Sequence, residues 1–225
     1  MKKIFVLIAV VFFSAFKVHA QSDQKLHFGL KAAPSLAWIS TDSKDFSSDG
    51  TKLGFTYGLI TEFSFSTHYA FATGIDVTYR GGNTKQSEVL SGSTTRVTES
   101  KMNLEYIEIP ITLKLKTAEI GYLTYFLQFG VEPGLNIRAK ADVKTTMQNP
   151  SAPVNSTSED NVDIKDNINS FNLSMVIGGG VEYTLSGSTV MLAGITFNNG
   201  FLDIVSGSDI KANSNYLALT LGVLF

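Results

Sequence analysis

Hydrophobic residues recur at every second position through most of the chain, which is the period of a β-strand rather than of a helix. The clearest run is Ile107, Ile109, Ile111, Leu113 and Leu115, which alternates with mostly polar side chains. The same pattern returns in segment after segment. It predicts eight strands, over residues 27–39, 53–65, 69–80, 103–116, 122–140, 170–184, 189–198 and 214–225.

The connections between these strands alternate between short and long. The short ones are 66–68, 117–121 and 185–188, and the long ones are 40–52, 81–102, 141–169 and roughly 199–213. Barrels of the bacterial outer membrane have tight periplasmic turns and longer external loops, whereas a soluble β-sandwich has no reason to keep every second connection long. The pattern predicts an all-β fold, an eight-stranded antiparallel transmembrane β-barrel with an OmpA/OmpX-like architecture.

Aromatic side chains gather at two levels of the predicted strands. Near the short-turn end fall Phe28, Phe63, Phe65, Tyr69, Phe71, Tyr183 and Phe225. Near the long-loop end fall Trp38, Phe55, Tyr79, Phe171 and Phe197. Two aromatic girdles that flank an aliphatic band match the two interfaces of a membrane, while the core of a soluble protein would show no such banding. We therefore expect outer-membrane lipid around the strands.

The amino terminus has the pattern of a secretory signal peptide. Lys2 and Lys3 precede an apolar run over residues 4–16, and residues 18–20 place small side chains where signal peptidase reads them. The run is too short for a membrane-spanning helix, which needs about 20 residues. We expect cleavage after Ala20, leaving a domain over residues 21–225 in the bacterial outer membrane. The absence of cysteine excludes a lipid-anchored lipoprotein, disulfides and thiolate metal sites.

The polar faces of the strands carry charges that a barrel would enclose. An eight-stranded barrel is narrow enough to be filled by its own side chains, and buried charges must be nearly balanced. We expect Lys31 and Glu62 to pair near the periplasmic end. The predicted polar network of the lumen consists of Lys31, Glu62, Asp76, Arg80, Glu108, Lys114, Glu132, Arg138 and Glu182.

Candidate groups for catalysis or metal binding are few. After export the chain keeps His27 and His68, both near the short-turn end, whereas enzymes built on membrane barrels place their catalytic groups on the external rim. Asp160, Asp163 and Asp166 lie in an acidic loop over residues 141–169, but their spacing does not fit an EF-hand, and a solvated loop is favoured. We expect no catalytic residues, no cofactor and no metal site.

Charge argues against one class of partner. Removal of residues 1–20 leaves 15 Lys and Arg against 20 Asp and Glu, so the mature chain carries about −5. Binding to phosphate backbones needs a clustered basic surface. A nucleic-acid partner is therefore not expected.

The segment Leu104 to Lys114, which reads LEYIEIPITLK, resembles a strand of PorT-type outer-membrane barrel proteins of Bacteroidota. Segments 126–134, 178–183 and 219–225 are similar to further strands of that family, so the resemblance covers essentially the whole mature chain. It implies a barrel inserted by the barrel-assembly machinery, which reads a last strand that ends in an aromatic residue such as Phe225. The family's association with protein secretion is not carried over, because the shared motifs build strands.

Three functions remain open from the sequence. The first is a structural or interaction barrel that binds an extracellular or envelope protein partner through its long external loops. The second is a narrow channel for small polar solutes, and the third is an enzyme at the rim of the barrel. We favour the first because the predicted lumen is filled with charges that can pair.

Overall fold

The computed structural model describes residues 26–41, 46–90, 94–148, 154–207 and 211–225. The predicted signal peptide and its cleavage after Ala20 lie outside the described residues. The strands are β1 (Leu26–Thr41), β2 (Phe46–Ser48), β3 (Lys52–Ser64), β4 (Tyr69–Val89), β5 (Thr95–Glu108), β6 (Ile111–Lys116), β7 (Leu123–Gln148), β8 (Asn155–Asp163), β9 (Phe171–Ser186), β10 (Thr189–Gly200) and β11 (Ala212–Leu224), with a short 3-10 helix, η2 (Lys165–Asn167). The predicted all-β antiparallel fold is confirmed.

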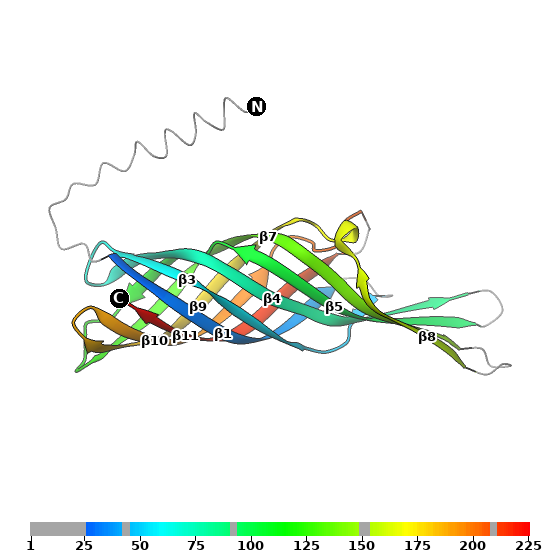
Figure 1. Cartoon of the computed structure of the whole chain (residues 1–225), viewed down its shortest axis with the longest axis horizontal. Helices are drawn as coiled ribbons and strands as arrows, with labels where there is room; N and C mark the ends of the chain where they lie inside the picture. The colour runs from blue at the N-terminus through cyan, green and yellow to red at the C-terminus, as the bar shows by residue number, and fades with distance from the viewer. Residues whose placement is uncertain (1–25, 42–45, 91–93, 149–153, 208–210) are drawn as a thin grey trace, which may run out of the picture.

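The sheet closes on itself into a ring (Figure 1). The order of neighbours runs β4-β3-β1-β11-β10-β9-β7-β5, and β4 pairs again with β5. The first and last strands of the ring, β1 and β11, join side by side, and just beyond β11 the amide of Phe225 donates to the carbonyl of Phe28 over 2.7 Å. Because every strand of the ring has two neighbours, its backbone donors and acceptors are paired, as a membrane interior requires.

The position of the ring between β4 and β7 is shared by β5 and β6, since Pro110 has no amide hydrogen and interrupts the ladder. Both pieces pair with β4 on one side and β7 on the other. The ring therefore contains eight strand positions, as the sequence pattern predicts.

Polarity across the wall is the reverse of that in a water-soluble protein. Outward side chains are large and apolar, and Leu53, Leu127 and Leu30 are 80%, 63% and 59% exposed. Inward side chains include ionisable groups such as Glu62 and Asp76, which are 0% and 1% exposed. An apolar exterior around a polar interior is the arrangement expected of strands that face hydrocarbon.

Among the described residues, no helix is both long enough and apolar enough to cross a membrane.

Two of the long connections predicted as loops are strands instead. β4 continues to Val89 and pairs with β5 from Thr95 on, and β7 continues to Gln148 before it pairs back with β8. Figure 1 shows both hairpins projecting from one end of the ring. Their sequences are mostly polar on both faces because neither face meets hydrocarbon, so the alternation that reveals the other strands is missing. We call this the hairpin end and the opposite one the turn end.

Candidate functional site

The turn end of the interior is filled by a cluster of two lysines and two glutamates. Lys114 Nζ lies 2.7 Å from Glu62 and also pairs with Glu182, while Lys116 pairs with Glu62 and lies 3.0 Å from Glu182. The Nζ of Lys114 also lies 4.1 Å from the centre of the Phe126 ring, within cation–π range. Each charge thus has two opposite partners, as burial of ions requires. Lys116 was missing from the predicted network, although it shares the parity of Lys114 along β6.

The predicted pair of Lys31 with Glu62 is wrong, because Lys31 pairs with Asp76 at 2.5 Å. The register explains this: Gly58 of β3 lies opposite both Lys31 of β1 and Asp76 of β4. Gly58 has no side chain, and a Cβ there would lie 2.2 Å from Asp76 Oδ1, so the lysine reaches across the vacant position. Glu62 lies opposite His27, nearer the turn end.

The lysine–glutamate cluster and the pair of Lys31 with Asp76 form two polar layers of the interior, and a third polar layer lies nearer the hairpin end. Arg80 lies 3.1 Å from Glu108 and stacks over the ring of Tyr106 at 4.2 Å. Glu132 accepts hydrogen bonds from Asn198 at 2.7 Å and from the hydroxyl of Tyr216 at 2.9 Å. Both charged side chains of the ion pair are almost fully buried, so they belong to the interior of the barrel at this level.

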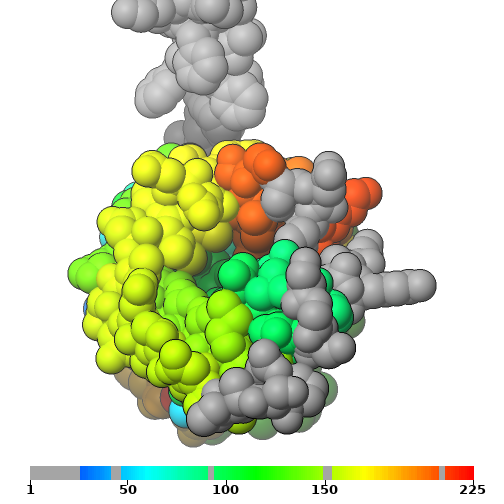
Figure 2. Space-filling view, turned by 90° about the vertical axis from the view of Figure 1, so that its right-hand side faces the viewer, coloured from blue at the N-terminus to red at the C-terminus, as the bar shows by residue number. Residues whose placement is uncertain are grey.

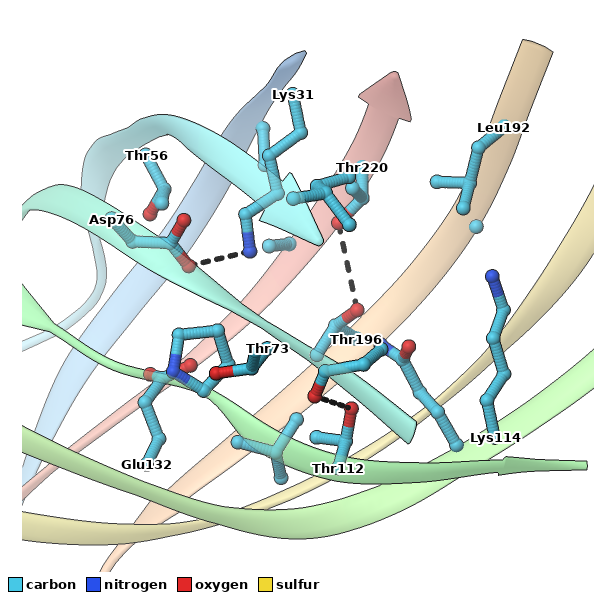
Figure 3. Close-up of a pocket in the computed structure, with 18 of the residues that line it drawn as sticks. Lys31, Thr56, Thr73, Asp76, Thr112, Lys114, Glu132, Leu192, Thr196 and Thr220 are labelled. Atoms are coloured by element: carbon cyan, nitrogen blue, oxygen red, sulfur yellow. Dashed lines mark hydrogen bonds and ion pairs between the residues drawn. The ribbon is translucent and has the colours of Figure 1, made fainter. Parts of the chain in front are cut away.

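Between these layers lies a cavity of about 70 Å³ that is lined by both polar and apolar groups. Figure 3 shows Lys31 pointing toward Asp76 on one side of it, with the hydroxyls of Thr196 and Thr220 facing each other on another. Glu132 and Lys114 line the cavity as well. A space of this size holds a few water molecules, and buried ion pairs occupy the interior on both sides of it.

Arg138 is not in the lumen, contrary to prediction. β7 pairs Arg138 with Glu105 and Asn136 with Tyr106, so Ile137 is an extra residue opposite the β5 strand. Such a β-bulge shifts the alternation by one position. Ile137 and Arg138 are consequently both exposed, and Ala139 takes the next inward position.

An apolar lid covers the interior at the hairpin end. Ile168, from the segment after η2, and Ile204, from the connection between β10 and β11, pack together with inward residues of the ring such as Ile39, Leu104 and Tyr106. The lid is held by backbone and amide hydrogen bonds, including Asn169 Nδ2 to the carbonyl of Asp203 at 2.8 Å. Parts of the long connections before β9 and before β11, which the sequence predicted as loops, therefore fold inward over the mouth of the barrel.

Comparison with known proteins identifies the family. A family model described as "Outer membrane protein beta-barrel domain" matches residues 19–206. The chain belongs to this family. Its location in the bacterial outer membrane follows from that membership, and the apolar outer wall agrees with it.

The solved structures that match this chain do so at low sequence identity. Neisserial surface protein A is 14% identical, with 88% of this chain and 95% of that chain covered and a TM-score of 0.47. OprG from Pseudomonas aeruginosa is 12% identical over 91% and 98%, with a TM-score of 0.42. Ail of Yersinia pestis, in complex with a heparin analogue, is 13% identical over 89% and 99%, with a TM-score of 0.37. Comparison with curated proteins gives no match.

The aromatic residues assigned to the girdles face outward from this outer-membrane barrel. Nine are exposed: Phe28, Phe55, Phe65, Tyr69, Phe71, Tyr79, Phe171, Tyr183 and Phe225. Trp38, Phe63 and Phe197 are half-buried against the wall, and the ring of Trp38 stacks on that of Phe197 at 6.2 Å. Along β9, Phe171 and Tyr183 are separated by about 30 Å of membrane thickness, at about 3.3 Å per residue and a strand tilt of about 40°.

No group of three or more histidine, cysteine or carboxylate side chains suited to a metal occurs in the described part of the outer-membrane barrel. His68 lies in the exposed turn between β3 and β4, where its Nδ1 is 3.2 Å from the hydroxyl of Thr67. His27 lies near the start of β1, at the same end of the barrel. Both histidines are thus remote from the hairpins.

Proposed function

We propose that this outer-membrane protein has an OmpA/OmpX-like, side-chain-filled barrel and serves as a membrane-anchored interaction protein. The observation that carries the proposal is the contrast between its two parts. The interior is occupied by paired charges and covered by an apolar lid, whereas β7 continues about 30 Å beyond Arg138 at about 3.3 Å per residue. An interior occupied by paired charges and a long projecting sheet suit contact with a partner outside the membrane.

The projecting part forms a hairpin sheet of β2, the ends of β4, β5 and β7, and β8. Its two faces differ in charge. The outer face alternates acids and bases, with Glu99 opposite Lys144 and Lys101 opposite Asp142. On the inner face, which is continuous with the lid, Ser100 lies opposite Val143 and Thr98 opposite Thr145. Near the mouth the inner face thus carries hydroxyl and apolar groups, which suit a partner contact better than a fully charged surface, and the ion pair of Arg96 with Glu88 lies nearer the tip of this face.

The inner face leads into a pocket at the mouth of the barrel. The pocket has a volume of about 150 Å³ and is lined by apolar groups such as Met102, Val143 and Ile168, with Ser100 and Asn167 as polar groups. Figure 2 views this end directly and shows a hollow between the segment around β8 and η2, in yellow, and the green strands. A concave apolar site with a few polar groups is the usual form of a binding site.

Photocrosslinking tests the partner contact. With p-benzoylphenylalanine in place of Thr145, on the inner face, we expect a discrete crosslinked adduct in intact cells. The same probe in place of the adjacent Lys144, on the outer face, is the matched control and is expected to give no such band. Adduct formation from both positions alike, or from neither, would contradict an inner-face partner site. Gel electrophoresis followed by mass spectrometry reads out the adducts.

The narrow channel is the second candidate, and the cavity of about 70 Å³ is the observation that favours it. The three polar layers and the lid argue the other way. In planar bilayers, we expect the purified protein to give no stable single-channel steps. Discrete, ion-selective openings of the unmodified protein would replace the interaction proposal by the channel.

We also propose, from the sequence resemblance, that the chain is of the PorT type and that the barrel-assembly machinery inserts it. We propose in addition that it is not an enzyme, since His27 and His68 lie at the turn end, away from the projecting hairpins. The hairpin end is the external one in this proposal, as the long connections of such barrels are.

A further inference from the structure

The β-bulge on β7 places a cation at the edge of the lipid-facing wall. Leu135 and Ile137, on the turn side of Arg138, are 57% and 46% exposed and belong to the apolar band. The next residues of β7 on the hairpin side, from Lys140 on, are mostly polar. Arg138 therefore stands where hydrocarbon gives way to headgroups. Bulges are a common means of redirecting a side chain, and here the bulge moves an arginine out of the interior.

Two lysines join Arg138 around one pocket on the outside of the barrel. The pocket has a volume of about 250 Å³, and Lys52, Arg138 and Lys140 line it together with Asn103 and Tyr79. Lys52, at the start of β3, is held there because its Nζ donates to the carbonyl of Met102 at 3.2 Å and to the side-chain oxygen of Asn103. Two strands far apart in sequence thus contribute the three cations, Lys52 from β3 and both Arg138 and Lys140 from β7.

The cations that line this pocket outnumber its lining carboxylates, although Glu105 lies opposite Arg138 in the β5–β7 register and Asp163 lies opposite Lys140 in the β7–β8 register. Glu105 is the carboxylate that lines it, against four cations, of which Arg80 is already paired with Glu108 in the interior. Within the residues that the structure describes, no carboxylate lies within 4.0 Å of the charged nitrogens of Lys52, Arg138 or Lys140, although the chain as a whole is negative. Like charges gathered beside a low-dielectric layer repel one another, and a bound anion relieves that repulsion.

We propose that this pocket binds the phosphate group of a membrane lipid in the leaflet on the hairpin side. A phosphate is the anion that lies at the edge of the hydrocarbon, and guanidinium and ammonium groups both donate charge-assisted hydrogen bonds to it. Leu53, which is 80% exposed and also lines the pocket, and Ile137 beside it offer apolar surface for the acyl chains. A lipid thus contacts both the cations of the pocket and the apolar surface beside them, whereas a free phosphate ion contacts the cations alone.

Native mass spectrometry of the detergent-solubilised protein tests the site, with dioleoyl phosphatidic acid as the probe. The variant K52Q/R138Q/K140Q is expected to raise the apparent Kd for this lipid about tenfold or more, because charge-assisted contacts are lost. The control K85Q/R96Q/K144Q removes the same number of positive charges from the hairpins and is expected to leave the Kd unchanged. A heat-modifiable gel shift checks that both variants are folded, and R138Q alone, with a smaller loss, serves if the triple variant does not fold.

Three further results would each overturn the proposal. The first is an equal loss of binding in the two triple variants, which would show a general charge effect. The second is binding of dioleoylglycerol, which has the same acyl chains without phosphate, as tightly as phosphatidic acid. The third is displacement of the lipid by inorganic phosphate at equal concentration, which would make the pocket a site for a free anion. Retained lipid in the presence of inorganic phosphate supports the lipid as the source.

Discussion

Replacing Lys114 with methionine is expected to lower the free energy of unfolding by about 3–5 kcal/mol, which is typical when one partner of a buried ion cluster is removed. Lys114 is 1% exposed and is paired with both Glu62 and Glu182. Without it, the two carboxylates would share Lys116 alone in a site that water scarcely reaches. Urea unfolding of the protein folded into phospholipid vesicles, followed by the fluorescence of the single tryptophan, Trp38, measures the change.

Two matched variants separate charge from packing in this experiment. Lys144→Met makes the same chemical change at an exposed position of β7, and we expect a change within about 0.5 kcal/mol. Adding Glu182→Gln to Lys114→Met leaves one acid and one base in the cluster and is expected to recover a large part of the loss. If Lys114→Met proves no more costly than Lys144→Met, the charge cluster does not stabilise the barrel in the way described.

Replacing Ile177 with arginine is expected to destabilise the barrel by about 2–4 kcal/mol, the cost of a basic side chain at the midplane of a bilayer. Ile177 lies on β9 midway between the aromatic residues Phe171 and Tyr183, and its side chain is 48% exposed. In water such a substitution on an exposed strand position would have little effect. The effect therefore reports the medium around the wall, and urea unfolding from vesicles again provides the measurement.

Val89→Arg is the control for this prediction. Val89 is 77% exposed, more than Ile177, but it lies at the tip of the β4–β5 hairpin, beyond the apolar band. We expect a change within about 0.5 kcal/mol there. Equal tolerance of arginine at both positions would mean that the region around Ile177 faces water, and the assignment of the wall to the membrane would have to be abandoned.

The ring strands could be predicted from sequence because lipid on one side and a polar interior on the other impose an alternation that runs through whole segments. The same rule failed on the hairpins, where both faces of β8 are in contact with solvent and no alternation exists to be read. The composition of such a segment shows that it is polar but does not show that it forms strands, so residues 141–169 were expected to be a loop.

Within the interior, parity predicted which side chains turn inward but not which of them pair. Lys31 reaches Asp76 because a glycine separates them in the register, and strand register depends on how the whole ring closes. Arg138 was misplaced because a single inserted residue, Ile137, shifts the alternation without a sequence signal. Lys116 could have been found by extending the parity of Lys114 by two residues. Lys116 therefore belongs to the polar interior, and Arg138 does not.

The seam between β1 and β11 has a consequence for biogenesis. Each of these strands completes its ladder only with the other, at opposite ends of the chain. Until β11 has been synthesised, β1 exposes a row of unsatisfied amides and carbonyls, which hydrocarbon does not tolerate. Contacts of such large sequence separation also slow folding. The polypeptide must therefore be kept from inserting strand by strand as it emerges, and enter the bilayer as a nearly finished whole.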